Sequence, residues 1–445
     1  MGCGASRAEG GDEHASEHIR RSVNERAQEP TPGSAASAPK MPVRFGGSGL
    51  GFRQRVIALA LFWLVGINLR TVLLGVPPAL PTLHRALGLS YSAAGLLTAL
   101  PILMLAAGAV PGAFVVGRFG ARGAVTIGLT LVTAGAAMRG SAPMALTLFA
   151  FTIVMAAGIA ITQPALPTLT QNWFPDHIGR ATGVYSNGLL VGEVIAAVVT
   201  LPVLLGRFAL GWQGALAIWA LPASACLLAW VLLAPPARRA TAEAVDRWLP
   251  DLRSGRAWRL GLLMGGASVI YFGMNAWIPD TLAARGEAEL TTAALGLLNF
   301  MQLPVSAAVV LAGDRLVGRR WPYVLAGLLS VVGLAGFILG PAPAVPGFAG
   351  LLGAGSSLVF ILNLGLPPLL AAPREVASLS AFMFTAGYAC AFFGPALGGV
   401  AWDASGVWQL ALAPIALACA IVIGLGASLP ISQLRRTRQE AFRSA

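Results

Sequence analysis

Hydrophobic residues in this chain gather into long apolar runs, which short polar or arginine-containing connections separate. Each run is about 20 residues long, the length of α-helix that crosses the hydrocarbon core of a bilayer. We therefore predict an all-α integral membrane protein rather than a soluble domain. The twelve predicted transmembrane helices cover residues 56–80, 93–116, 121–138, 143–170, 182–205, 214–233, 260–282, 291–311, 322–340, 345–370, 376–402 and 407–429.

The charge distribution follows the predicted spans. Only 11% of the 445 residues are charged and 56% are hydrophobic, yet the net charge is +12. After the start of the first span, the connections and the C-terminal segment on the side of the two chain ends carry 17 arginines, against four on the other side. This asymmetry is the positive-inside pattern, so we expect both termini to be cytoplasmic. Membrane topology thus accounts for the excess of positive charge, which argues against a nucleic-acid partner.

Neither the N-terminal tail nor the cysteines show a catalytic or metal-binding pattern. Residues 1–52 are polar, carry charges of both signs and cannot bury a core, so we predict a disordered cytoplasmic tail. The four cysteines are scattered, which excludes a disulfide framework and a cysteine-rich metal site. We accordingly predict no cofactor and no metal.

The chain repeats itself. "GRFGARG" at residues 117–123 is echoed by "GDRLVGRR" at residues 313–320, each following a predicted span. Two six-helix halves result, at residues 53–233 and 260–430, with a cytoplasmic linker at 234–259 and a cytoplasmic tail at 431–445. Parallel halves of this kind are typical of transporters that rock around a central site.

These paired loops resemble the signature of the major facilitator superfamily, Gly-x-x-x-Asp-Arg-x-Gly-Arg-Arg. The resemblance implies two pseudo-symmetric six-helix bundles, and it implies that the loops act as conformational switches. The first loop has Gly117 in place of the acidic residue. The matching residues are Arg118, Gly120 and Arg122 in the first loop and Asp314, Arg315, Gly318, Arg319 and Arg320 in the second.

A narrower resemblance covers most of the chain between Asn68 and Leu429. "FPDHIGRATGVYS" at 174–186, "AWIPDTLAARG" at 276–286 and the long segment at 379–408 are similar to the cyanate permease and nitroimidazole transporter family. This resemblance implies a bacterial inner-membrane carrier that imports a small anion such as cyanate or exports a small organic compound such as a nitroimidazole. The family usually has a lysine and a glutamine where this chain has Gln171 and Phe384. These departures favour a larger or more apolar ligand than cyanate.

Arg70 and Glu193 are the charges that we place clearly within the membrane, away from the ends of the predicted spans. At 1.5 Å per residue, Arg70 lies about 21 Å into the first span and Glu193 about 17 Å into the fifth. A guanidinium in hydrocarbon is costly, so Arg70 is expected to face the protein interior or water. One interpretation is a static ion pair between the two. The other is that Arg70 binds an anionic or electron-rich ligand while Glu193 competes for Arg70 and couples transport to protons.

Several uncharged polar residues in the spans are further candidates for the ligand site. Amides can line a cavity or join helices by hydrogen bonds, and tyrosines can face an aromatic ligand or pack in the core. The seventh and tenth helices line the pathway in the major facilitator fold, which favours the amides of those two helices. The substrate-binding candidates besides Arg70 are Gln163, Tyr185, Asn275, Asn363 and Tyr388.

Taken together, the sequence predicts a proton-coupled secondary transporter that moves a small anionic or electron-rich solute across the bacterial inner membrane by alternating access. Away from their ends the spans offer no histidine and a single carboxylate, which argues against a membrane enzyme. No G-x-x-x-x-G-K-[ST] phosphate loop is present, which argues against an ATP-driven pump. The alternatives are an exporter of small aromatic drugs that needs no anionic group and a non-transporting membrane sensor.

Overall fold

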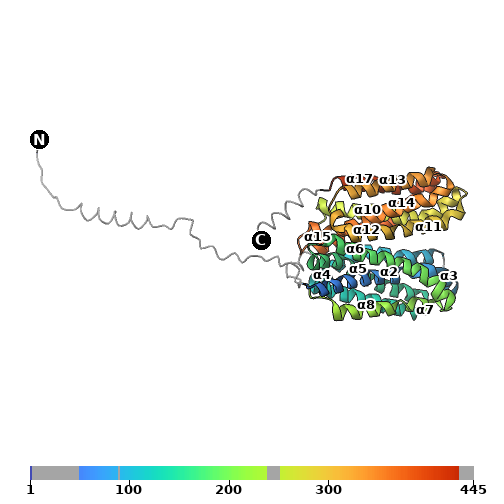
Figure 1. Ribbon diagram of the computed structural model, residues 1–445, viewed down its shortest axis with the longest axis horizontal. Helices are drawn as coiled ribbons and strands as arrows, with labels where there is room; N and C mark the ends of the chain where they lie inside the picture. The colour runs from blue at the N-terminus through green and yellow to red at the C-terminus, as the bar shows by residue number, and fades with distance from the viewer. Residues whose placement is uncertain (3–49, 89–90, 238–250, 430–445) are drawn as a thin grey trace. The chain divides into compact units, whose positions relative to one another are not determined.

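A computed structural model describes residues 1–2, 50–88, 91–237 and 251–429, and the helices of this part run side by side (Figure 1). The predicted N-terminal tail, most of the predicted linker and the C-terminal tail lie outside the described residues. The first group of helices is α2 (Phe52–Leu74), α3 (Val76–Leu87), α4 (Tyr91–Gly140), α5 (Ala145–Trp173), α6 (Ile178–Val199), the π-helical segment η2 (Thr200–Arg207), α7 (Trp212–Ala217) and α8 (Ala220–Leu233).

The second group follows the gap at residues 238–250. Its helices are α10 (Gly255–Ala284), α11 (Thr291–Phe300), α12 (Gln302–Leu316), α13 (Trp321–Leu339), α14 (Val345–Leu364), α15 (Pro367–Leu370), α16 (Val376–Ser405) and α17 (Ala413–Ala427). Short 3₁₀ turns at Ala288–Leu290, Ala342–Ala344 and Trp408–Leu412 precede α11, α14 and α17.

The described helices agree with twelve membrane spans. Ten helical stretches are long and apolar enough to cross a membrane. One of them, Ala99–Gly140, has 42 residues and belongs to α4, which contains the second and third predicted spans. Gly120 interrupts α4 with φ 75° and ψ 161°, a backbone conformation that a side chain would disfavour, so the chain turns back there. The 22-residue α6 supplies the remaining span.

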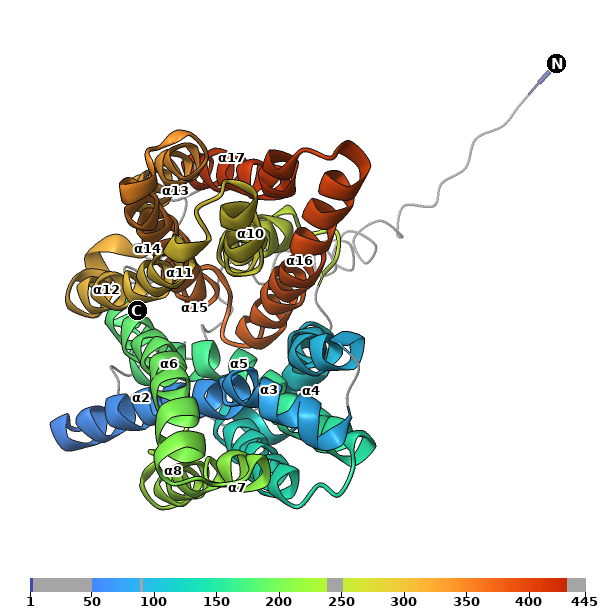
Figure 2. The same cartoon turned by 90° about the vertical axis from the view of Figure 1, so that its right-hand side faces the viewer.

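The helices form two bundles, as Figure 2 shows with α2–α8 below and α10–α17 above. In the first bundle α4 packs on α5, and α2 packs on α6. In the second bundle α10 packs on α16, and α13 packs on α14. This arrangement confirms the predicted all-α fold of two six-helix bundles.

Glycines bring α2 and α6 into close contact and thereby place Arg70 beside Glu193's helix. A Cβ added at Gly188 would overlap the backbone of Trp63, and one at Gly192 would overlap the backbone of Ile67. Small residues at this spacing let helix backbones approach closely inside a membrane. The first and fifth predicted spans are therefore neighbours.

Contacts between the two bundles gather on the side where α2 begins and α17 ends, which we call the arginine-rich side. Asp314 of α12 accepts a hydrogen bond from the Arg180 backbone N–H at the start of α6 (3.0 Å) and pairs with Nδ1 of His177 (3.1 Å). Gln171 of α5 donates to the carbonyl oxygens of Pro368 and Ala371 at 2.8 and 3.0 Å. The bundles are thus joined at this side.

Candidate functional site

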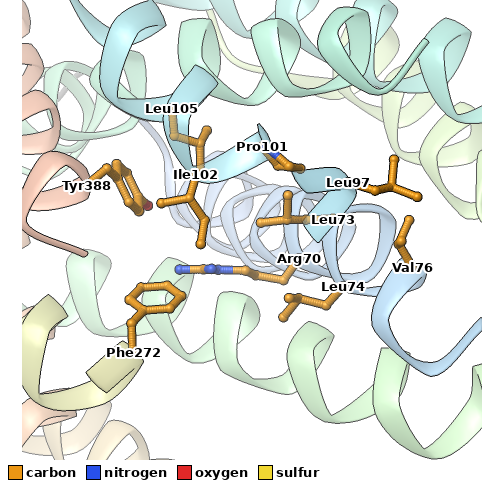
Figure 3. A pocket seen from close by; sticks show the side chains of 10 residues that line it. All are labelled: Arg70, Leu73, Leu74, Val76, Leu97, Pro101, Ile102, Leu105, Phe272 and Tyr388. Carbon is orange, nitrogen blue, oxygen red and sulfur yellow. The ribbon is translucent and has the colours of Figure 1, made fainter. Parts of the chain in front are cut away.

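A cavity lies between the two bundles next to Arg70 (Figure 3). Its empty volume, including the part open to solvent, is about 420 Å³. Eight of the ten lining residues are apolar, and the two polar ones are Arg70 and Tyr388. The lining residues are Arg70, Leu73, Leu74, Val76, Leu97, Pro101, Ile102, Leu105, Phe272 and Tyr388.

Arg70 extends from α2 toward the space between Phe272 and Tyr388 (Figure 3). Its side chain is only 7% exposed. Its Nε has no hydrogen-bond partner among the described residues, and no described carboxylate forms an ion pair with it. A buried guanidinium without a protein partner is costly inside a membrane. Arg70 therefore has donors to offer to a ligand in the cavity.

Tyr388 joins the two bundles beside Arg70. Its hydroxyl accepts a hydrogen bond from Nε2 of Gln163 on α5, with 2.7 Å between nitrogen and oxygen. The Tyr388 ring is stacked on that of Phe384, the residue that replaces the family's glutamine, at 6.1 Å between centroids. Gln163 thus holds Tyr388 in place, and the Phe384 ring extends the apolar surface behind it.

Glu193 does not pair directly with Arg70 in this conformation, although electrostatic influence reaches from one to the other. Instead its Oε1 lies 2.5 Å from the hydroxyl oxygen of Tyr271 on α10, and the same hydroxyl lies 2.8 Å from Oδ1 of Asn299 on α11. Nδ2 of Asn299 donates to Oδ1 of Asn275 at 3.2 Å. The Glu193 carboxyl group is therefore held across the two bundles by a chain of polar side chains.

Two of the residues predicted to bind substrate lie away from the cavity. Asn363 is fully buried and its Nδ2 donates to the Leu260 carbonyl oxygen (3.0 Å), which joins α14 to α10. Tyr185 is 2% exposed and its ring meets that of Phe62 edge to face in the first bundle. Both side chains contribute to helix packing here, because each faces a neighbouring helix of its own bundle.

Arg139 is a buried charge that we had placed in a connection. It ends the second half of α4, is 0% exposed and donates through Nη2 to the Val72 carbonyl oxygen at 2.8 Å. Its Nε and Nη1 have no hydrogen-bond partner in the described part of the chain. Arg139 is thus a buried charge outside the predicted spans, because the apolar run ends one residue before a side chain that folds back into the bundle.

The predicted switch loops carry several contacts between helices. Arg122 donates to the Val231 carbonyl oxygen (3.1 Å) and Arg320 donates to that of Leu429 (2.7 Å), so each loop is fastened to the last helix of its own bundle. Gly318 has φ 77°, close to the 75° of Gly120, which reflects the internal repeat. Asp314 alone of the predicted loop residues forms a side-chain ion pair with the other bundle in the described residues.

Comparison with known proteins agrees with this geometry. The family model "Major Facilitator Superfamily" matches residues 58–313. The 2-nitroimidazole transporter of Escherichia coli (strain K12) is 31% identical over 382 residues, 83% of this chain and 94% of that protein. Cyanate transport protein CynX of the same strain is 30% identical over 345 residues, 77% of this chain and 89% of that protein.

Among solved structures, that of the Escherichia coli fucose:proton symporter FucP superposes with a TM-score of 0.64 at 15% identity, covering 84% of this chain and 98% of that one. At this identity the likeness concerns the fold. The curated relatives are named as transporters, and the helices and cavity fit such a protein. The chain belongs to the Major Facilitator Superfamily, as a multi-pass membrane transporter of the group that includes these two Escherichia coli proteins.

Proposed function

We propose that this protein is a secondary active transporter that binds a small anionic or electron-rich solute at Arg70 and carries it across the membrane by alternating access. The observation that carries the proposal is the unpartnered guanidinium facing the cavity between the bundles. Its planar donors suit a carboxylate, a nitro group or a similar pair of acceptors. Arg70 is therefore the residue that orients the solute.

The cavity lining favours a solute with an apolar, flat body over a bare small anion. Phe272 and Tyr388 provide ring surfaces near the guanidinium, and aliphatic side chains form most of the remaining wall. Cyanate would leave most of this apolar wall without a contact. A planar ring that bears an electron-rich group fits both parts of the cavity, so the nitroimidazole-like class is favoured over cyanate.

Proton coupling belongs to the same proposal. Glu193 is within electrostatic range of Arg70 and is held by Tyr271 of the other bundle. A group that contacts both bundles can link its protonation to their relative movement. Glu193 is therefore the coupling residue, and Asn275 and Asn299 support the side chain that holds it.

The experiment is gradient-driven uptake by purified protein in proteoliposomes, with radiolabelled 2-nitroimidazole and cyanate as probes. An imposed proton gradient without ATP should drive accumulation or exchange of 2-nitroimidazole above protein-free vesicles, and cyanate should move less. Uptake that requires ATP would contradict the secondary-carrier proposal. So would the absence of uptake for both probes in a protein preparation that binds them.

Orientation completes the proposal: the protein lies in the bacterial inner membrane with both termini cytoplasmic, because its arginines follow the positive-inside pattern. A reporter active only in the periplasm should work when fused after Arg207 or Arg285 and fail after Arg436. The reverse pattern of reporter activity would overturn the orientation.

A further inference from the structure

Three oxygen atoms lie in a row between the bundles, and their contacts allow the hydrogens to be counted. The Tyr271 hydroxyl oxygen lies 2.5 Å from Oε1 of Glu193 and 2.8 Å from Oδ1 of Asn299. Both separations are hydrogen-bond distances between oxygens, and each such contact needs one hydrogen. A phenol carries a single hydrogen, so Tyr271 alone can supply only one of the two.

The asparagine amides cannot supply the missing hydrogen. Nδ2 of Asn299 donates to the Leu295 carbonyl oxygen (2.9 Å) and to Oδ1 of Asn275, while Nδ2 of Asn275 donates to the Tyr271 carbonyl oxygen (2.8 Å). Turning the Asn299 amide over would aim its oxygen at the Leu295 carbonyl oxygen, and two acceptors would then face each other. The backbone therefore fixes both amides, and Oδ1 of Asn299 faces Tyr271 as an acceptor.

We infer that Glu193 is a protonated carboxylic acid in this conformation and that Tyr271 and Asn299 form the site that holds its proton. The Glu193 O–H donates to the Tyr271 oxygen, and the Tyr271 O–H donates to Oδ1 of Asn299. With a carboxylate instead, the Tyr271 hydrogen would turn toward Glu193, and Asn299 Oδ1 would keep only the distant Nε2 of Gln302 at 3.5 Å. The protonated form satisfies every oxygen in the row.

The charged and titratable groups around Glu193 come from the helices that pack against α6 and from α10 and α16 of the other bundle. Those near the cavity are Arg70 on α2 and Tyr388 on α16, besides Tyr271 on α10. At the arginine-rich end, α12 carries Arg315 and Asp314, which pairs with His177, and α2 carries Arg53 and Arg55. α5 and α14 carry no charged side chain, and α6 and η2 carry Arg180 and Arg207 at their far ends. Arg70 is thus the cation that a carboxylate at Glu193 would attract.

With this placement, proton binding at Glu193 favours anion binding at Arg70 and the reverse, a consequence that rests on the proposed function. When Glu193 is neutral it does not compete for Arg70, and the guanidinium is available to the solute. When the carboxyl O–H bond breaks, the proton leaves to water and the remaining carboxylate draws Arg70 toward itself. Proton binding and anion binding are therefore coupled with the same sign, and linkage requires the effect to be reciprocal. Such coupling moves a proton and an anion together.

The test is infrared spectroscopy of the purified full chain in lipid nanodiscs without substrate, so its result does not depend on the proposed transport. At neutral pH the wild-type spectrum minus that of Glu193→Gln should contain the C=O band of a protonated carboxylic acid, shifted in heavy water. The matched control is Asp280→Asn, which removes an exposed carboxylate from the helix that carries Tyr271. The wild-type spectrum minus that of this control should contain only carboxylate bands.

Tyr271→Phe removes the acceptor of the proton and leaves the ring. It also removes the hydrogen-bond donor that a carboxylate would need, so Glu193 should stay protonated in that variant and its carboxylic acid band should move to higher wavenumber. A wild-type minus Glu193→Gln spectrum that contains carboxylate bands and no carboxylic acid band would overturn the inference. So would a band of unchanged position in Tyr271→Phe, because the proton would then not be donated to this hydroxyl.

Discussion

Arg70 and Arg139 are two buried arginines of the same bundle with different surroundings. Neither forms an ion pair with a described carboxylate, and their side chains are 7% and 0% exposed. Arg139 reaches across from α4 to the Val72 carbonyl oxygen, two residues beyond Arg70 on α2. Arg70 reaches away from its own bundle into the cavity. The first ties two helices together, and the second leaves its donors free.

The two guanidinium groups differ in the hydrogen-bond acceptors that they reach. α2 ends at Leu74, and Pro77 and Pro78 at the start of α3 lack the N–H groups that would continue its hydrogen bonds. Arg139 donates to a carbonyl oxygen in this weakened stretch and so steadies the part of α2 that carries Arg70. A buried charge therefore indicates a ligand site only when its donors point into a cavity.

The largest effect on stability is expected from Arg139→Ala. The substitution empties a fully buried position and removes the donor to Val72, and comparable losses cost about 2–5 kcal/mol. The thermal unfolding midpoint in detergent should fall clearly. Arg70→Ala breaks no hydrogen bond of the described residues and should leave the midpoint nearly unchanged. An equal fall in both variants would remove the distinction between the two arginines.

The next largest effect is expected on the transport rate of the double variant Arg70→Ala, Glu193→Ala. A purely structural ion pair predicts that the double variant regains the transport lost in each single variant, since no unpaired charge remains. Because the two side chains are not directly paired here, we expect the double variant to transport no better than Arg70→Ala. Gradient-driven uptake of 2-nitroimidazole measures this, and transport at the parent rate would end the ligand role of Arg70.

Much of the fold follows from the sequence because apolar length and glycine placement are local properties. The spans were predicted from such properties, and the helices confirm them. The break at Gly120 falls in the predicted connection between the second and third spans. Arg139 was missed because its position at the end of an apolar run does not reveal whether the side chain turns inward. Only its contact with α2, close to where that helix ends, shows that Arg139 turns inward, and such a contact between helices cannot be read from the sequence.

The site itself was harder to predict because it depends on contacts between distant segments. Depth suggested Arg70 as the partner of Glu193, but Tyr271 approaches from the other bundle, 78 residues away in the chain. Tyr271 stands one helical turn before the predicted Asn275, so a search for polar residues on that face of α10 would have found it. Asn363 and Tyr185 do not line this cavity, and sequence cannot distinguish a cavity wall from a helix interface.

A smaller effect is expected from the pair that positions Tyr388. Gln163→Leu and Tyr388→Phe each remove the same 2.7 Å hydrogen bond between the bundles, which is worth about 1 kcal/mol. The dissociation constant of 2-nitroimidazole should rise roughly fivefold in each, and the double variant should add little, since both lose one bond. Additive effects on affinity would show that Gln163 and Tyr388 act independently.

The smallest effect is expected from Tyr185→Phe. The Tyr185 hydroxyl has no hydrogen-bond partner among the described residues, and its ring packs against Phe62 outside the cavity. Ligand affinity and thermal stability should both stay near those of the parent protein. A marked loss of affinity would mean that the ligand site extends into the first bundle and that the cavity at Arg70 is only part of it.

The most direct test of the central claim is ligand-induced thermal stabilisation of purified protein, measured with 2-nitroimidazole, cyanate and a small aromatic carboxylate. The parent protein and the Tyr185→Phe control should both be stabilised by the aromatic probes. Arg70→Ala should lose the shift while remaining folded, and Arg70→Lys should lose it too, because a point ammonium cannot reproduce the planar guanidinium. Undiminished stabilisation of Arg70→Ala by every probe that stabilises the parent protein would contradict the account.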